Sequence, residues 1–280
     1  MAEAWPVDVR RPDELPEPLA ARLAEQLEQG EIVHKRIWVP ADPGPLSRGG
    51  RTSGFWMLTR GDQLLVATDR RLIVGAAAAA DETSRWLAIP YASVLAWALT
   101  ETLLYGRVDV CGERSGSLVK ASVEFNTVGR WMIEEALLPL KTAVLGIQAQ
   151  PASSRSVHRP DPPGLSMKFI NFLRHELLAG EWPVGLVFEE ARFRRFFGLW
   201  QRLARPAQLV VMTDLRLLVI REEPGFKEAR HGYTTASLPR RHLGDVTVVD
   251  AGPNLAVRHG ASVAVLGPAQ AESERVRASA

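Results

Sequence analysis

The part of this sequence best suited to chemistry is a short segment, residues 191–205, in which arginines alternate with aromatic residues. A guanidinium group donates two parallel hydrogen bonds to phosphate or carboxylate, and aromatic rings among cations suit an anionic membrane surface. One interpretation is a lipid- or anion-binding hairpin made by Arg192, Arg194, Arg195, Phe197, Trp200 and Arg202. The alternation of arginine with phenylalanine favours the other, a half-buried strand with core aromatics, whose arginines pair with Glu189 and Glu190.

Patterns typical of catalytic and metal sites are missing from the sequence. It has no nucleophile elbow, no phosphate-binding lysine loop, no dinucleotide-binding glycine motif and no His-Glu-x-x-His. The six histidines lack the spacing of metal ligands. Adjacent carboxylates such as Glu222 and Glu223 would point to opposite faces of a strand. We expect no enzyme activity, no catalytic residue, no metal and no cofactor.

Composition and charge place the chain among globular proteins of a reducing compartment. Cys111 is the single cysteine, so an internal disulfide is excluded. The sequence begins without a secretory signal, and it lacks the run of about 18 apolar residues that spans a membrane. We predict a cytoplasmic location, with peripheral attachment to the inner face of the membrane if the hairpin binds lipid. Residues 1–150 carry 16 Lys and Arg against 19 Asp and Glu, whereas residues 151–280 carry 18 against 13, so the second half favours anionic partners.

An internal repeat organises the chain. Residues 64–74 recur as residues 209–219, and both copies contain Thr-Asp-x-Arg-Leu. Gly-Glu precedes each copy and an apolar residue followed by proline comes after each, in the same order. A solenoid would have a much shorter period. We therefore predict two copies of one domain.

The length of 280 residues fits two domains of ordinary size. The first is predicted over residues 1–150 with a helix at each end, and the second over residues 164–280 with a short C-terminal tail. Residues 151–163 between them are rich in proline and poor in apolar residues, which indicates a semi-extended linker.

Each copy is expected to begin with a helix and to continue with strands. Leucines four residues apart between Leu15 and Leu27 mark one helix, Met167 to Leu177 marks the other, and a glycine follows each. Seven strand-like runs follow in the first copy: residues 31–39, 54–59, 63–67, 71–76, 84–89, 103–110 and 118–125. A helix is predicted over residues 126–145, where Pro139 should bend it or end it early.

The repeated pattern resembles bacterial pleckstrin-homology-like and GRAM-like domains, which carry a similar Leu-Thr-Asp-x-Arg-Leu hairpin. The resemblance covers about two thirds of each half. It implies a mainly β fold with flanking helices, built from two tandem pleckstrin-homology-like β-barrel or sandwich domains, each plugged by a C-terminal helix. The second copy departs from this pattern because residues 268–280 contain one large apolar residue, Val276.

The repeated motif itself is interpreted as structural. Asp69 and Asp214 are placed to bond backbone amides of a tight turn. Arg71 and Arg216 are expected to be solvated on a strand face, with contact to an acid or a ligand as the alternative.

Two functions therefore follow from the sequence. The preferred one is a non-enzymatic adaptor that binds a protein partner or self-associates, using apolar surface around Val263 and Val265 that the short tail leaves uncovered. The alternative is peripheral binding to anionic phospholipid through the hairpin. Nucleic acid is disfavoured because the chain lacks a broad basic field.

Overall fold

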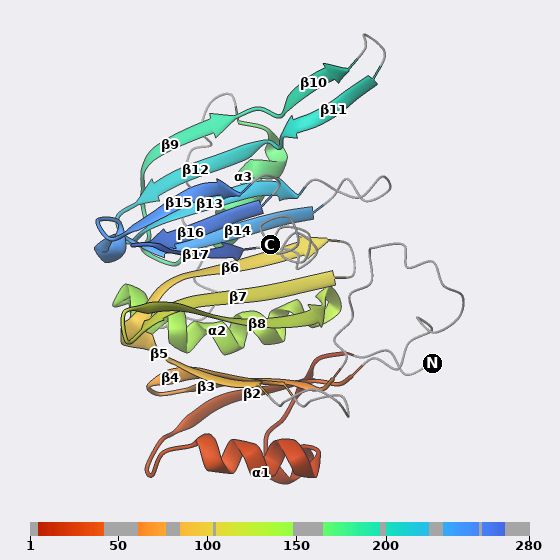
Figure 1. The fold of residues 1–280 in the computed structure, drawn as a ribbon, viewed down its shortest axis with the longest axis vertical. Helices are drawn as coiled ribbons and strands as arrows, with labels where there is room; N and C mark the ends of the chain where they lie inside the picture. The colour runs from red at the N-terminus through yellow and green to blue at the C-terminus, as the bar shows by residue number, and fades with distance from the viewer. Residues whose placement is uncertain are drawn as a thin grey trace.

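The structure, a computed structural model, describes residues 5–41, 61–76, 85–102, 105–147, 165–196, 200–223, 232–251 and 254–266. Among these residues the chain is mainly β, with four antiparallel sheets and three α-helices. Figure 1 shows the sheets stacked along the long axis of the molecule. The predicted linker and the predicted strand at 54–59 lie outside the described residues.

The first half comprises β1 to α2. Its elements are β1 (Val7–Asp8), η1 (Pro12–Glu14), α1 (Glu17–Gln26), β2 (Val33–Val39), β3 (Gln63–Thr68), β4 (Arg71–Ala76), β5 (Arg85–Pro90), η2 (Tyr91–Ser93), β6 (Val94–Thr102), β7 (Tyr105–Arg114), β8 (Ser117–Asn126), η3 (Thr127–Gly129) and α2 (Arg130–Leu145). Strands β1 to β5 form a sheet in sequence order.

The second half comprises α3 to β17. Its elements are α3 (Met167–Glu176), β9 (Pro183–Glu189), β10 (Arg192–Phe196), β11 (Trp200–Arg205), β12 (Gln208–Thr213), β13 (Arg216–Glu223), β14 (Gly232–Pro239), η5 (Arg240–His242), β15 (Val246–Ala251), β16 (Asn254–His259) and β17 (Ser262–Leu266). Strands β15 to β17 form a separate sheet, and β10 pairs only with β11.

The order of elements repeats between the halves. In each, a helix precedes four strands that pair in sequence order, and three further strands follow a short 3₁₀-helix. Asp69 and Asp214 lie in the turns β3–β4 and β12–β13, as predicted. The predicted bonds to turn amides are wrong, because the two carboxylates accept from the backbone N–H groups of Ile32 and Trp182. The main differences are that the hairpin β10–β11 is inserted after β9, and that neither β1, which pairs with β2, nor α2 has a counterpart among the described residues of the second half.

The predicted barrels are wrong, because the sheets are open. Strand β6 pairs antiparallel with β14, which joins the halves into one seven-stranded sheet of order β8-β7-β6-β14-β13-β12-β9. The backbone N–H and C=O groups along the edges of β6 and β14, which would otherwise be exposed, are paired with one another in this way. Strand β6 was not predicted from the sequence, because its apolar residues do not alternate. Both of its faces are buried, which removes the alternation.

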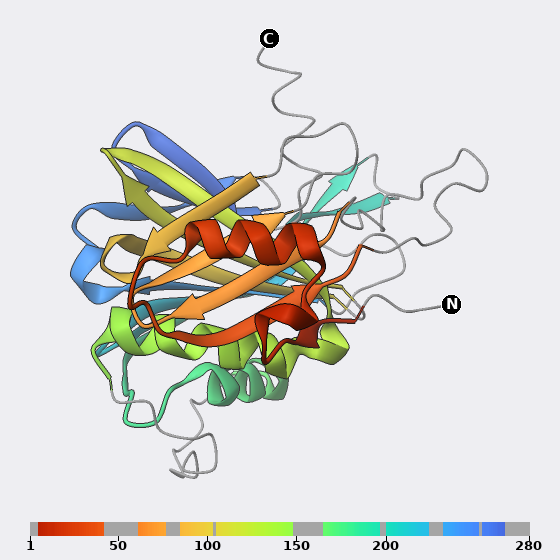
Figure 2. The same ribbon diagram turned by 90° about the horizontal axis from the view of Figure 1, so that it is seen from below.

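Four apolar clusters cover the faces of these sheets. One lies between the β1–β5 sheet, strands β6–β8 and α2, and a second lies between α1 and the outer face of β3 and β4. A third packs α3 on β12 and β13. The fourth lies on the opposite face of the seven-stranded sheet, beneath β15–β17. Figure 2 shows α1 lying across its sheet and α2 beside α3.

Helix α2 continues through Pro139 to Leu145 and ends at Gly146, which has a φ of 67°. Proline has no backbone N–H, so one helical hydrogen bond is missing at Pro139. The buried side chains of Ala136, Leu137 and Leu140 stabilise the helix on both sides of this position. The expectation of an early end was therefore wrong.

Candidate functional site

The repeated motif of the first half is one hydrogen-bonded network. Thr68 Oγ1 accepts hydrogen bonds from the backbone N–H groups of Arg70 and Arg71, which closes the β3–β4 turn. The Arg71 guanidinium donates to both carboxylate oxygens of Glu31, at 2.9 and 2.6 Å, and to the carbonyl oxygen of Gln26 at the end of α1. These bonds lower the pKa of Glu31 to about 2. Arg71 thereby ties the helix to the hairpin.

The second half repeats the network at greater depth. Arg216 donates to Glu181 Oε1 and Oε2 at 2.9 and 3.0 Å, to the Glu176 carbonyl at 2.6 Å and to Ser237 Oγ at 2.7 Å. Both Arg216 and Glu181 are fully buried. Burial alone would raise the pKa of Glu181, but the charge of Arg216 and its hydrogen bonds outweigh burial and lower it.

The expectation of solvated arginines was therefore wrong. Each motif arginine is a structural residue that uses the glutamate of the preceding Gly-Glu pair. Gly30 and Gly180 have φ values of 75° and 80°, a left-handed conformation that places the glutamate after each helix. The recurrence of Gly-Glu before both copies was the sequence signal for this partner.

The predicted lipid-binding segment forms the hairpin β10–β11, which projects from the molecule beyond β9 and β12 (Figure 1). Arg192 is exposed, and Phe193 is 60% exposed. Phe197 lies outside the described residues, and so do the side chains of Arg194, Arg195, Trp200 and Arg202. One arginine of this segment does pair with Glu189: Arg205 Nη1 lies 2.8 Å from Glu189 Oε2.

The register of this hairpin places cations opposite cations. Arg194 is paired with Arg202, and Arg192 with Arg205. Like charges directly opposite one another on neighbouring strands are destabilising. The charge of Arg205 is balanced within the chain by Glu189.

The predicted protein-binding residues lie on β17. Val263 is 50% exposed, whereas Val265 is half-buried and its carbonyl accepts a hydrogen bond from Lys120 Nζ on β8 at 2.9 Å. Strand β17 is thus held against the first half along part of its length. Residues 268–280, which were predicted to cover this region poorly, lie outside the described residues.

A more exposed apolar surface, which the sequence analysis missed, lies on β9. Val187 pairs with Val210 of β12 as Ile37 of β2 pairs with Leu65 of β3, and both follow the Gly-Glu pair at the same distance. Ile37 is fully buried beneath α2, but Val187 is 59% exposed. Val184 of the same strand is 68% exposed. Only the comparison of the two halves in three dimensions reveals this difference.

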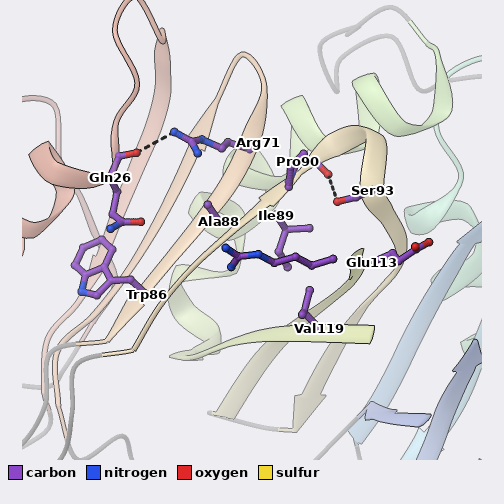
Figure 3. A pocket seen from close by; sticks show the side chains of 10 residues that line it. Gln26, Arg71, Trp86, Ala88, Ile89, Pro90, Ser93, Glu113 and Val119 are labelled. Carbon is purple, nitrogen blue, oxygen red and sulfur yellow. Dashed lines mark hydrogen bonds between the residues drawn. The ribbon is translucent and has the colours of Figure 1, made fainter. Parts of the chain in front are cut away.

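A cavity of about 340 Å³ lies in the first half between β5 and the β7–β8 turn (Figure 3). Gln26, Trp86 and Glu113 line it, together with Arg71, which is committed to Glu31. Ser93 Oγ donates to the carbonyl oxygen of Pro90 at 2.9 Å. These side chains do not assemble a nucleophile and a base, and the volume is at the low end for a ligand pocket.

A charged cluster joins α2 to α3. Arg130 contacts Glu101 at 2.7 Å, Glu134 at 3.0 Å and Glu176 at 3.5 Å, and His175 lies beside Glu134. Burial raises the pKa of Glu101 to about 7, although Arg130 opposes that rise. Glu134, His175 and Glu176 bring possible metal-ligand atoms within 4.8 Å of one another. Because Arg130 already supplies the positive charge there, the cluster suits an inter-helix ion pair better than a metal.

A polar row crosses the seven-stranded sheet at the junction of the halves. Each member is directly opposite the next: Glu124, Arg107, Thr100, Thr234, Arg221, Gln208 and Glu189. At the junction the hydroxyl groups of Thr100 and Thr234 are hydrogen-bonded at 2.8 Å, and both are buried. A slip of one residue between β6 and β14 would break this bond, so the row favours a single register.

Comparison with protein-family models finds no match to this chain, and comparison with curated proteins finds none either. Among the described helices, none is long and apolar enough to cross a membrane.

Proposed function

We propose that this chain is a non-enzymatic interaction protein whose second half binds another protein chain. The observation that carries the proposal is the exposure of strand β9: Val187 is 59% exposed where the first half has the buried Ile37, and Val184 is 68% exposed. Exposed apolar residues grouped on a sheet edge are characteristic of protein-binding surfaces. Val263 adds a second exposed apolar position in the same half.

The pleckstrin-homology-like assignment belongs to this proposal. It is supported in the first half by four strands in sequence order, three more strands and then a helix, and in the second half by the same strand order. Domains of this kind serve many unrelated functions. The pleckstrin-homology-like assignment therefore concerns only the architecture, and the proposal of protein binding depends on the exposed strand β9.

The test compares the full chain with a Val187→Lys variant as immobilised probes in a lysate of the source cells. Proteins retained by the wild type and lost from the variant support the proposal. Val128→Lys is the matched control, because it makes the same change at an exposed valine of the first half. Identical sets of retained proteins on all three probes would exclude β9 as the binding surface.

A second candidate function is peripheral binding to anionic phospholipid through the hairpin β10–β11, on which Arg192 and Phe193 are exposed. Replacement of Arg192, Arg194 and Arg195 by Glu should abolish sedimentation with phosphatidylglycerol vesicles. Added salt should weaken it, because exposed charges are screened beyond about 8 Å at physiological ionic strength.

The matched control for this experiment carries glutamate at Arg240, Arg241 and Arg258, three exposed arginines elsewhere in the second half. It has the same net charge as the hairpin variant. Equal loss of sedimentation in both variants would assign binding to overall charge, and equal retention would exclude the hairpin.

A further inference from the structure

Strand β9 is a free sheet edge in the described part of the chain. The seven-stranded sheet ends at β8 on one side and at β9 on the other. The β8 end lies against β17, with Lys120 bonded to the Val265 carbonyl. The β9 end has no neighbouring strand among the described residues, so its outer edge presents backbone hydrogen-bonding groups.

The equivalent edge in the first half is closed by another strand. There β1 adds antiparallel to β2, with Val7 opposite Trp38 and Asp8 opposite Ile37. Trp38 and Ile37 correspond to Phe188 and Val187 of β9 through their pairing with β3 and β12. The fold therefore accepts an added antiparallel strand at this position, and β9 lacks one within the described residues.

The sequence of β9 lacks the charges that usually protect an edge. Residues 184–188 read Val-Gly-Leu-Val-Phe, whereas β2 carries His34, Lys35 and Arg36 at the corresponding positions. Glu189 at the end of β9 is engaged by Arg205 and Gln208. Natural proteins place charged side chains or proline along exposed edges to prevent pairing. In β9 such residues stand only at the two ends, Pro183 and Glu189, so residues 184–188 between them are suited to pairing.

The same five residues are complementary to themselves. In an antiparallel pair centred on Leu186, Val184 of one strand lies opposite Phe188 of the other, and Gly185 lies opposite Val187. A side chain at Gly185 would meet nothing within 4 Å in its own chain, so packing within the chain does not require glycine there. Glycine does leave room for an opposing valine. Because Glu189 then lies opposite Pro183, no like charges meet.

From these observations we propose that β9 pairs antiparallel with β9 of a second copy of this chain, about a two-fold axis at Leu186. The seven-stranded sheet then continues from one copy into the other. The pairing of β6 with β14 is the same kind of junction within one chain. This inference rests on the proposed protein-binding function of β9 and names the partner.

Sedimentation velocity of the full chain over a concentration series tests the pairing. The wild type should reach twice the monomer mass, Val187→Lys should stay at the monomer mass, and the Val128→Lys control should behave as wild type. Circular dichroism of each variant checks its fold; Val187 and Val128 are both exposed, so the fold should persist. A wild type that remains monomeric, or a Val187→Lys variant that still dimerises, overturns the inference.

Cysteine crosslinking tests the register, because the native Cys111 is buried. Gly185→Cys and Val187→Cys should crosslink strongly under mild oxidation when mixed, since directly opposed residues have Cα atoms about 4.5–5.5 Å apart. Either variant alone should crosslink weakly, because like positions are displaced along the strands. Equal crosslinking of the mixture and the single variants overturns the centring on Leu186.

These outcomes separate the inference from the function on which it rests. If the wild type is monomeric but its retention of other proteins from lysate depends on Val187, the function stands and the second copy is excluded. If neither dimerisation nor retention depends on Val187, both fail.

Discussion

Strands β2 and β9 occupy equivalent positions in the two halves but have opposite surroundings. Ile37 of β2 is buried beneath α2, and β1 closes the outer edge of its sheet. Val187 of β9 is 59% exposed, and its edge is free in the described residues. The strands share one pairing pattern, so the difference arises from the elements packed against them.

The two halves share the ion pair that ties the first helix of each half to the hairpin carrying the repeated motif, which we call the anchor. Glu31–Arg71 and Glu181–Arg216 are made by the same atoms in both halves. The peripheral elements differ, and the surface available for binding differs with them. A repeated fold can therefore keep one copy closed and leave the other copy open to partners.

The largest expected effect separates the two anchors. Arg216→Met should destabilise the protein by about 3–5 kcal/mol, because it leaves Glu181 buried without its partner. Arg71→Met should cost less, since Arg71 is 14% exposed and water can reach its site. The urea midpoints of the two variants measure the difference. Equal losses would contradict the ranking by burial.

The next largest effect separates the two strands. Ile37→Ala should cost about 2–5 kcal/mol, because it leaves a cavity in the core beneath α2. Val187→Ala should change the stability by less than about 0.5 kcal/mol in the monomer, since the side chain is already hydrated. Chemical denaturation at low protein concentration measures both. A large loss at Val187 would show that β9 is covered within its own chain.

A smaller effect depends on pH and concerns the contact of α2 with α3. The folded-state pKa of Glu101, about 7, lies above its ordinary value of 4.5, so the folded protein takes up a proton between these values. Its contribution to stability is therefore present below about pH 4.5 and is lost as the pH rises to about 7.

Glu101→Gln should remove this pH dependence. The free energy of unfolding of the variant, relative to that of the wild type, should therefore rise by about 2 kcal/mol from pH 5 to pH 8. Urea midpoints at the two pH values measure the gain. Glu25→Gln on α1, where the carboxylate is 59% exposed, is the control and should shift both midpoints equally. A wild type and a Glu101→Gln variant with parallel pH profiles would contradict the buried charge.

The smallest effect tests the junction of the halves. Thr100→Val and Thr234→Val should each cost about 0.5–1.5 kcal/mol, because each removes the buried hydrogen bond between the two hydroxyl groups. The double variant should cost less than the sum and approach neutrality, since both polar groups are then removed. A double-mutant cycle in urea measures the coupling, and additive costs would argue against the bond between Thr100 and Thr234.

Local rules recovered much of the secondary structure from the sequence. The leucines of α1, the turn residues around Asp69 and Asp214, and the repeated order of strands were predicted because they depend on neighbours in the chain. Strand β6 was missed because burial on both faces removes alternation, and the continuation of α2 past Pro139 was missed because distant packing holds it. The segment with arginines and aromatics was correctly recognised as a hairpin, and its binding role stays a prediction.

By itself, the sequence determined that the chain repeats one pattern, that the pattern is mainly β, and that each copy carries a Gly-Glu and a Thr-Asp-x-Arg motif. Only the tertiary structure decided which acid each arginine meets, that β6 joins β14, and that Val187 is exposed where Ile37 is buried. The reason is physical. Hydrogen-bonded turns and helix periodicity are fixed within a few residues, whereas burial and strand pairing depend on which distant element occupies the adjoining space.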